Sequence, residues 1–260
     1  MNDMEFDYEQ WRELQANDFP MGSWWDIASR DKSDGHDEVY HGCFVPQIPH
    51  YFIYRFTKPG DTVFDPMMGS GTTGIEAVKL GRNFLGVDIN QDVCDAAEKR
   101  IRKVAKKNGH DVTVDVGCGD VMDLELDESP DLVMFHPPYL GIIQFNPDNE
   151  ACWGNLDAPE FLRQVRVFWN NFSKILKPGA HVVLVIGDVW RKGEYYPLAF
   201  NTLQQMLCCD LELRGIVVKN VTNTKNQQKN KNLWYYRAAK NGTFVFQHEY
   251  IMLLRRKGTK

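Results

Sequence analysis

A glycine-rich segment between a short strand and a helix limits the folds open to this chain more than any other feature. The segment is Asp65-Pro-Met-Met-Gly-Ser-Gly-Thr-Thr73, which follows the β-rich residues Thr62–Phe64 and leads into a helical stretch, Thr73–Leu80. Glycines let backbone N–H groups approach a ligand that a side chain would block. A strand, a glycine turn and a helix in this order predict one of the nucleotide-binding α/β folds.

Beyond this segment, strand-like and helix-like patterns alternate along the chain. Strands are expected at Asn83–Val87, Val112–Val116, Asp131–Phe135, His181–Ile186, Glu212–Val218 and Thr243–Leu254. Helices are expected at Tyr51–Phe56, from an Asn90 cap to about Lys107, at Pro159–Leu176 and at Leu198–Leu207. The polar segment Asn220–Asn232 is expected to be a loop. This alternation predicts a doubly wound, mostly parallel α/β sheet of Rossmann-like topology, with an antiparallel strand at its C-terminal end.

Length and composition are compatible with one large α/β domain. Of the 260 residues, 43% are hydrophobic and 25% are charged, which allows a full core. The chain has no run of about 18 apolar residues and no apolar signal segment, so we expect a cytoplasmic protein without membrane contact. The six cysteines form no Cys-x-x-Cys pair and no ligand spacing with histidine. Reduced thiols and no metal site are therefore expected.

The two ends of the chain carry opposite charge, although the net charge is only −5. Residues 1–45 hold eleven acidic and three basic side chains, whereas residues 214–260 hold eleven basic side chains and one acidic. We expect residues 1–45 to be an acidic, tryptophan-containing extension, helical or partly ordered, ahead of a main domain over residues 46–260. A basic C-terminal region suits a phosphate backbone, although a soluble tail beside an edge strand has the same composition.

Three features separate the candidate ligands of the glycine turn. No Gly-Lys-Ser/Thr follows the turn, which excludes a Walker phosphate loop. Gly69, Gly71 and Gly74 keep the spacing of a dinucleotide fingerprint, so a nicotinamide cofactor stays open. Asp65 would repel a pyrophosphate, but it suits the sulfonium and ammonium groups of S-adenosylmethionine. Asp88, which ends the second strand, can accept hydrogen bonds from both ribose hydroxyls and also favours that cofactor.

A third acidic side chain follows the third strand. Asp120, in Cys118-Gly-Asp-Val121, could accept a hydrogen bond from the adenine amino group, or it could be a turn residue. The strand ends supply most members of the predicted cofactor site. They are Asp65, Pro66, Met67, Gly69, Ser70, Gly71, Thr72, Thr73, Asp88, Ile89, Asn90, Asp120 and Val121.

A rigid tetrapeptide, His136-Pro-Pro-Tyr139, follows the expected strand Asp131–Phe135. An aryl amine is a poor nucleophile, and acceptors around its hydrogens can pull the nitrogen toward sp³ geometry and stabilise the developing positive charge. Two prolines, Pro137 and Pro138, fix the backbone so that the Pro137 carbonyl can point at such an amine. Tyr139 offers a flat face for an extruded base. The four residues are therefore predicted to be catalytic, and a tight loop without catalytic function is the alternative.

These motifs, in this order, resemble those of the amino-methyltransferases of DNA. The resemblance covers about Pro46 to Ile186 and rests on Asp-Pro-x-x-Gly-Ser-Gly-Thr-Thr, the acidic end of the second strand and the polar-Pro-Pro-Tyr segment. It implies a methyltransferase sheet, S-adenosyl-L-methionine as cofactor, and methylation of adenine or cytosine amines in DNA, in a restriction-modification or phage setting. It also implies that the segment before the turn holds the methionine part of the cofactor, through Pro46, Gln47 and His50. The cofactor motif precedes the catalytic motif, as in one class of that family.

The first position of the tetrapeptide departs from the family pattern. The family usually has Asp, Asn or Ser there, and this chain has His136. A neutral imidazole can accept a hydrogen bond from the amine, whereas a protonated one cannot and opposes a developing cation. Activity is therefore expected to collapse as pH falls through the His136 pKa, and a flat rate between about pH 5.5 and 8 would count against this role. The departure also removes the usual indication of adenine or cytosine as the target.

Target selection is expected to involve segments outside these motifs. Candidates are the loop Gly141–Trp153, the basic stretch Lys219–Lys240 and the residues that follow the fifth strand. The predicted substrate-binding residues are Trp190, Arg191, Lys225, Lys229, Lys231, Trp234 and Arg237. A polar loop followed by core aromatics, with Trp190 packed on the next helix, explains the same residues without DNA. Double-stranded DNA is the expected partner, and a second copy or a partner subunit is left open. RNA, a protein glutamine amide, or cofactor binding without catalysis are the alternatives.

Overall fold

One sheet of eight strands organises the described part of the chain, which in this computed structural model comprises residues 8–16, 20–36, 42–141, 146–191, 193–221 and 225–258. The strands are β1 (Trp24–Trp25), β2 (Thr62–Asp65), β3 (Asn83–Asp88), β4 (Val114–Cys118), β5 (Leu132–Phe135), β6 (His181–Ile186), β7 (Val189–Arg191), β8 (Glu194–Tyr196), β9 (Leu211–Asn220) and β10 (His248–Arg256). The helices are α1 (Tyr8–Ala16), α2 (Gln47–Phe56), α3 (Thr72–Lys79), α4 (Gln91–Asn108), α5 (Ala158–Phe172), α6 (Leu198–Leu207) and α7 (Lys225–Asn241), with two 3-10 turns, η1 (Val121–Asp123) and η2 (Trp153–Asn155).

The sheet is doubly wound and mostly parallel, as the alternation of patterns predicts. Its strand order is β1-β9-β10-β6-β5-β2-β3-β4, and β7 and β8 form a separate hairpin. The neighbours from β6 to β4 pair in parallel. β10 runs antiparallel to both β6 and β9, which confirms the predicted antiparallel C-terminal strand. The strand order reverses between β2 and β5, and ligands of such sheets bind at that point.

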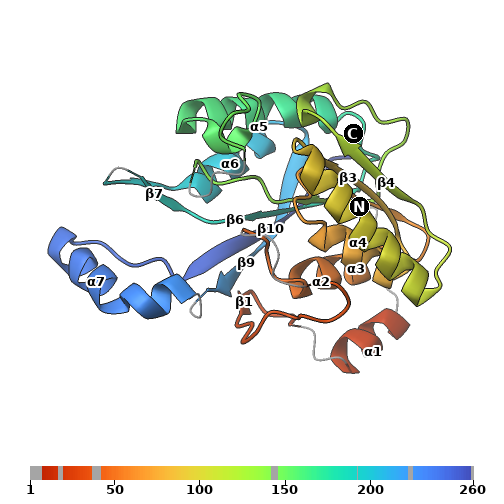
Figure 1. Cartoon of the computed structure of the whole chain (residues 1–260), viewed down its shortest axis with the longest axis horizontal. Coiled ribbons are helices and arrows are strands. Elements are labelled where there is room, and N and C mark those ends of the chain that lie inside the picture. Colours follow the sequence, from red (N-terminus) through yellow and green to blue (C-terminus); the bar gives the residue numbers. More distant parts are fainter. Residues whose placement is uncertain are drawn as a thin grey trace.

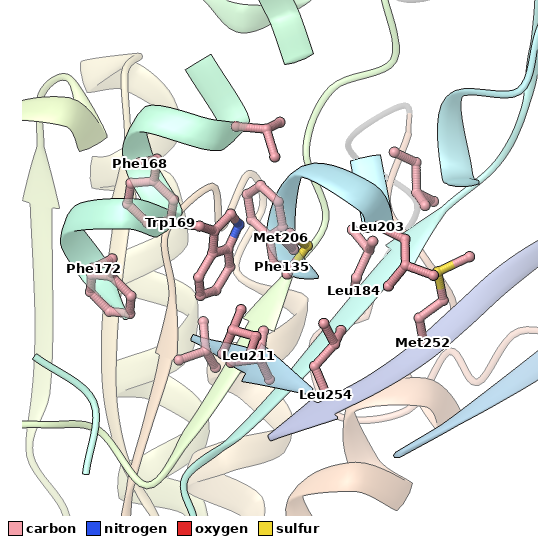
Figure 2. Packing of buried hydrophobic residues seen from close by; sticks show 14 of the residues in the cluster. Phe135, Phe168, Trp169, Phe172, Leu184, Leu203, Met206, Leu211, Met252 and Leu254 are labelled. Atoms are coloured by element: carbon pink, nitrogen blue, oxygen red, sulfur yellow. The ribbon is translucent and has the colours of Figure 1, made fainter. Parts of the chain in front are cut away.

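Two apolar layers, one on each face, hold the sheet. α5 and α6 cover one face, where Phe135 of β5 packs against the rings of Phe168 and Trp169 of α5 (Figure 2). α2, α3 and α4 cover the other face (Figure 1), and their fully buried side chains include Ile75 and Ile101. Because helices pack on both faces of the sheet, the strand ends beside the point where the strand order reverses are held in fixed positions.

The described part of the acidic extension packs on the sheet. β1 pairs in parallel with β9, the strand beside β10. Trp25 is 2% exposed, and its ring lies 4.9 Å from the ring of Tyr51 and 5.8 Å from that of Phe52, both in α2. α1 buries Leu14 in the same cluster. The extension therefore shares a core with the main domain.

Most expected elements lie within a few residues of their predicted bounds, and His181–Ile186 and Leu198–Leu207 match. The predicted loop Asn220–Asn232 is wrong, because α7 begins at Lys225. This helix has no apolar stripe that periodicity could reveal, although many of its residues (Lys, Gln, Arg, Leu and Ala) favour helices. The predicted strand Thr243–Leu254 begins only at His248.

α7 and the β7–β8 hairpin both extend away from the sheet, toward the left in Figure 1. Within the described ranges, no helix is long and apolar enough to cross a membrane. The same ranges contain no group of three His, Cys, Asp or Glu side chains that could hold a metal ion.

Candidate active site

A cavity opens at the carboxyl ends of β2, β3, β4 and β5. It contains about 1090 Å³ of empty space, part of it open to solvent. The predicted site residues that line it are Pro66, Met67, Gly69, Thr72, Asp88, Ile89, Asn90, Asp120, Val121, His136, Pro137, Pro138 and Tyr139. The glycine turn and the tetrapeptide therefore face one cavity, with room for a nucleoside-sized ligand beside a second planar ring.

The glycine turn is tightly enclosed by its neighbours. Gly69 and Gly71 have φ angles of 50° and 81°, a region that favours glycine. A Cβ atom on Gly71 would lie only 2.9 Å from Cδ1 of Ile101 in α4. On β3, a Cβ atom on Gly86 would lie 2.5 Å from Sδ of Met68. The missing side chains thus let the turn lie against α4 and β3 and form the floor of the cavity.

Asp65 braces the turn from behind and does not line the cavity. Its Oδ2 accepts a hydrogen bond from the Thr73 hydroxyl at 2.5 Å, and its Oδ1 accepts one from the Met67 N–H at 3.1 Å. Burial raises the pKa of Asp65 to about 7, against the lowering effect of these two bonds. Ser70, Gly71 and Thr73 also lie outside the cavity wall. The observed role of Asp65 is to hold the turn, and its contact with a sulfonium stays a prediction.

Asp88 and Asp120 bring two carboxylates to the cavity wall. Oδ2 of Asp88 accepts from the Gly69 N–H at 3.0 Å, and Oδ1 accepts from the Asn90 N–H at 3.1 Å. Burial raises the pKa of Asp88, against the lowering effect of its N–H donors. Asp120 caps η1, because its Oδ1 accepts from the Met122 N–H at 2.9 Å. Asp120 is thus a turn residue that also faces the cavity, and both carboxylates keep lone pairs for a ligand.

The tetrapeptide holds its imidazole between two aromatic rings. Nε2 of His136 lies 3.1 Å from the Tyr139 hydroxyl, and the planes of the two rings are 86° apart. The ring of Phe44 also meets the imidazole edge to face, at 4.9 Å between centroids. Gly187, just past β6, lies beside the Tyr139 ring, because a Cβ atom on it would be 3.6 Å from Cε2 of Tyr139. If Nε2–H of His136 donates to the Tyr139 hydroxyl, the Nδ1 lone pair is left as an acceptor.

His136 stays neutral well below physiological pH. Burial lowers the pKa of His136 to about 4, and the charges of Glu249 and Lys219 act on this pKa in opposite directions. The expected collapse of activity assumed an imidazole with an ordinary pKa, and the site changes that expectation. Because the imidazole remains an acceptor down to about pH 4, a flat rate between about pH 5.5 and 8 now agrees with an acceptor role.

The segment before the turn reaches the cavity through other residues than predicted. Residues 42–44 line the wall, and Pro46, Gln47 and His50 do not. α2 begins at Gln47, and the amide of this residue donates to the Ser29 carbonyl at 2.7 Å. The side chains predicted to hold the cofactor thus pack on the N-terminal segment and α3, because the helix turns them away from the cavity.

A buried carboxylate in α3 ties that segment to the turn. Glu76 is 1% exposed, with His36 Nε2 and His50 Nδ1 each 2.6 Å from one of its oxygens and Lys79 Nζ 2.8 Å from Oε1. Burial would raise the pKa of Glu76, but the hydrogen bonds and the Lys79 charge lower it to about 2. Sequence reasoning missed this cluster, because its members come from three separate segments and form no local motif.

The loop after the tetrapeptide supplies the other wall of the cavity. Its lining residues are Asn146, Ala151, Cys152 and Trp153. They fall in the segment Gly141–Trp153 that was predicted to select the target, of which residues 142–145 lie outside the described ones. Trp153 is 4% exposed and packs edge to face on Phe135 and Phe161. No local motif marks these individual residues within the segment.

Trp190 and Arg191 of β7 lie outside the cavity wall. Trp190 is 41% exposed and contacts the rings of Tyr195 and Phe246. Arg191 Nη1 donates to the Leu156 carbonyl at 3.3 Å. Arg191 is therefore beside the loop that closes the cavity, and Trp190 belongs to an aromatic cluster of the hairpin.

The remaining predicted substrate-binding residues lie on α7. Lys231 and Arg237 are exposed and Trp234 is half-buried. Lys225 and Lys229 are in the same helix, but their side chains lie outside the described part. The structure thus does not bring these residues to the cavity, and α7 extends from the body as a separate arm (Figure 1).

Two family models match the chain. One, described as a DNA methylase, matches residues 2–99, and one, described as an RMKL-like methyltransferase domain, matches residues 56–158. The Type II methyltransferase M.MjaII of Methanocaldococcus jannaschii is 37% identical over 86 residues, which cover 30% of this chain and 16% of that protein. The Type II methyltransferase M.HinfI of Haemophilus influenzae is 33% identical over 115 residues, 43% of this chain and 32% of that protein. The match spans less than a third of either relative.

Solved structures share the fold of this chain. TrmN from Thermus thermophilus superposes with a TM-score of 0.53 at 17% identity, over 83% of this chain and 50% of that one. A SAM-dependent methyltransferase from Methanosarcina mazei has a TM-score of 0.53 at 15% identity, over 80% of this chain and 98% of that one. These likenesses confirm the predicted Rossmann-like methyltransferase sheet and bear on the fold alone.

Proposed function

Because the chain belongs to the DNA amino-methyltransferase family over the stretch that these comparisons match, we propose that it methylates the exocyclic amine of an adenine or a cytosine in double-stranded DNA. The observation that carries the proposal is that the glycine turn, Asp88 and the tetrapeptide His136–Tyr139 face one cavity. Site-specific methylation in a restriction-modification setting, in the cytoplasm, belongs to the same proposal.

The donor set of the cavity suits S-adenosyl-L-methionine as the cofactor. Asp88 can accept from two ribose hydroxyls, and Asp120 can accept from the adenine amino group. Ile89 and Val121 give the wall apolar surface for the flat ring. Within its described residues the wall holds two carboxylates and no lysine or arginine, which favours a cationic ligand and opposes a pyrophosphate. When bound, the cofactor supplies an electrophilic methyl group on a sulfonium.

His136 is the proposed acceptor for the target amine. In the proposed tautomer, Nε2–H of His136 donates to the Tyr139 hydroxyl 3.1 Å away, and the Nδ1 lone pair is the acceptor for the amine. Methylation leaves a positive charge on the amine nitrogen, and that nitrogen then gives a proton to the imidazole. A conjugated amine is a very weak base, so even an imidazole with a pKa of about 4 can take its proton. This neutral acceptor supports an active enzyme over a cofactor-binding protein that has lost catalysis.

Pro137 and Tyr139 complete the proposed target site. Pro137 is buried, and the two successive prolines restrict the backbone that carries its carbonyl oxygen, a second acceptor for the amine. The Tyr139 ring lines the cavity and offers a face for a base taken out of the duplex. Base–aromatic stacking of this kind contributes about 1–3 kcal/mol.

α7 is the proposed contact with the DNA backbone. The helix carries no acidic residue, and Lys231 and Arg237 are exposed on it. Tyr235 and Tyr236 are also exposed, at 42% and 64%, and can pack against sugars or unstacked bases. Arg191, whose guanidinium donates to the Leu156 carbonyl beside the lining loop, is the proposed contact for the phosphate of an extruded nucleotide. Charge complementarity to a duplex supports this surface.

Incubation of the protein with cofactor that is radiolabelled in its methyl group tests the proposal. Duplex DNA, RNA and a glutamine-containing protein serve as parallel substrates, and His136→Ala serves as the control. We expect label in DNA alone, and digestion to nucleosides then distinguishes N6-methyladenine from N4-methylcytosine. Label in RNA or in protein only would contradict the proposal.

A further inference from the structure

An ion pair between a buried lysine and a partly buried glutamate lies in the sheet beside the tetrapeptide. Nζ of Lys219 in β9 lies 2.7 Å from Oε1 of Glu249 in β10, and the two residues face each other across the antiparallel strands. Lys219 is 5% exposed, and Glu249 is the single acid of residues 214–260. Taking two charges out of water carries a desolvation penalty that a pair of apolar side chains would not have. Stability alone therefore explains this ion pair poorly.

The pair lies against the residues that hold the target amine. A Cβ atom on Gly187 would be 3.6 Å from Cε2 of Tyr139 and 3.9 Å from Cβ of Glu249, so the ring and the acid flank one glycine. The hydroxyl of Tyr139 lies 3.1 Å from Nε2 of His136, within hydrogen-bond distance. Glu249 is thus separated from His136 by the Gly187 backbone and the Tyr139 ring.

The charges that face His136 come from two strands only among the described residues. Glu249 of β10 raises the pKa of His136 and Lys219 of β9 lowers it, both less than burial does. Tyr139 contacts the imidazole from its own segment, and Phe44 contacts it from the N-terminal side as an apolar ring. The balance of charge at the imidazole is therefore set by this one ion pair.

We propose that the Lys219–Glu249 pair is a positioning and charge-setting element for His136. In the reaction proposed above, on which this inference rests, a nitrogen–carbon bond forms, the sulfur–methyl bond breaks, and the amine proton moves to the imidazole. The Glu249 carboxylate stabilises the imidazolium that results. Lys219 holds the carboxylate in place and keeps the imidazole neutral before the transfer, so that it can accept the amine hydrogen.

Two substitutions of opposite charge test this role directly. Lys219→Met removes the positive charge and Glu249→Gln removes the negative one, and the double variant removes both. NMR titration of the imidazole, assigned with His136→Asn, follows the protonation of His136 without DNA or cofactor. We expect Lys219→Met to move the midpoint up by about one pH unit and Glu249→Gln to move it down, with the double variant between them.

Activity should change in the same sense. Lys219→Met gains an acid limb above pH 5 that the unmodified protein lacks, whereas Glu249→Gln lowers kcat by about 10-fold with an unchanged KM for DNA. Arg255→Met is the matched control, because Arg255 pairs with Glu212 across the same two strands at their other end. Arg255 lowers the pKa of His181, so this variant should move the His181 midpoint upward and leave His136 unchanged.

Midpoints of His136 that stay fixed in both single variants overturn the charge-setting role. If Lys219→Met does not fold, two other variants test the charge-setting role by the same titration. They are Glu249→Gln, which keeps an oxygen for Lys219, and the double variant Lys219→Met/Glu249→Met. Methyl transfer to DNA with fixed midpoints refutes this inference alone. Shifted midpoints without methylation of any substrate refute the proposed function, and the role in proton acceptance with it.

Discussion

The cofactor side of the cavity is built mainly from residues 65–90, joined by Asp120 and Val121 after β4, whereas the target side is assembled from more distant segments. On the cofactor side, Asp65 holds Thr73, and Asp88 accepts the N–H of Gly69, all within residues 65–90. On the target side, His136 meets Phe44 from the N-terminal segment and feels charges from β9 and β10. The first arrangement is encoded locally and the second exists only in the folded chain.

This difference separates two kinds of failure. Changes on the cofactor side should alter stability and cofactor affinity together, because the turn is part of the core on which α3 and α4 pack. Changes on the target side should alter rate or DNA affinity while the fold persists. A target-side variant that lowers stability or cofactor affinity would show that the two sides are coupled.

The largest effect is expected for His136→Ala. Loss of the acceptor should lower kcat by about 10³-fold, because a positioned acid or base contributes about 10²–10⁴-fold. Cofactor affinity should be unchanged, since His136 sits on the target side. His136→Asn is the matched control, because its amide oxygen can also accept from the amine, and we expect it to retain at least a tenth of the activity. Single-turnover methylation and calorimetry measure the two quantities.

The same residue gives a pH test with a defined sign. The neutral imidazole persists until the pH falls to about 4, so the rate per folded molecule should be flat from pH 8 to about 5.5. The free energy of unfolding behaves differently. Burial lowers the pKa of His136 and of His181 to about 4 in the folded protein, below the ordinary 6.5. The stability that both contribute is therefore present above pH 6.5 and is lost as pH falls toward 4. Circular dichroism must therefore accompany each rate, and an acid limb centred near 6.5 in fully folded protein would contradict the assigned environment.

The next largest effect is expected for Gly86→Ala on the cofactor side. The new Cβ would meet Met68 Sδ at 2.5 Å and Phe84 Cε1 at 2.6 Å, so the turn or the strand must move. Overpacking of this kind costs about 1–3 kcal/mol, and we expect the upper end because the site is enclosed. Gly117→Ala on β4 is the control, since its Cβ would make an ordinary contact of 3.6 Å with Val87. Urea unfolding compares the two, and equal midpoints would mean that the turn is less rigid than its contacts indicate.

A third comparison sets Asp88 against Asp120. Asp88→Ala removes the acceptor of the Gly69 and Asn90 N–H groups as well as the ribose acceptor, so cofactor affinity should fall by about 100-fold. Asp120→Ala removes a cap and one adenine contact, and about 10-fold is expected. Isothermal calorimetry with S-adenosyl-L-methionine measures both. The reverse order would place the ribose on the β4 side of the cavity.

The local stretch could be predicted from the sequence because its logic is short-range. The roles of several residues depend only on neighbours a few positions away: Gly69 and Gly71, the acid at the end of β3 and the prolines after β5. Spacing predicts these roles, but it does not predict that Asp65 holds the turn. The cap of α4 is of the same kind, because Asn90 Oδ1 accepts from the Asp92 N–H at 3.1 Å. Strand and helix order followed from the same patterns.

The assembled side could not be predicted, for three physical reasons. α7 lacks an apolar stripe, so periodicity could not reveal a helix that extends from the core. The N-terminal segment lines the cavity through residues 42–44 and not through Pro46, Gln47 or His50, because α2 turns His50 toward Glu76. The pKa of His136 depends on burial by segments from both ends of the chain, which no local motif contains.

The smallest effect is expected on α7, and it decides whether the target side extends to this arm. Lys231→Ala with Arg237→Ala should weaken binding to duplex DNA by about 10-fold and reduce the slope of log K against log salt by about 2, because each phosphate contact releases about one counterion. The control is Lys103→Ala with Lys106→Ala, which removes two exposed charges of α4, a helix that packs on the sheet. Rate at saturating DNA should not change, since neither residue reaches the cavity. Equal losses of DNA affinity for the two pairs would mean that α7 contributes only general electrostatic attraction. A larger loss of affinity for the α7 pair, of similar size on any DNA sequence, would mean that this helix binds the DNA backbone. Base recognition would then belong to the loop around Trp153.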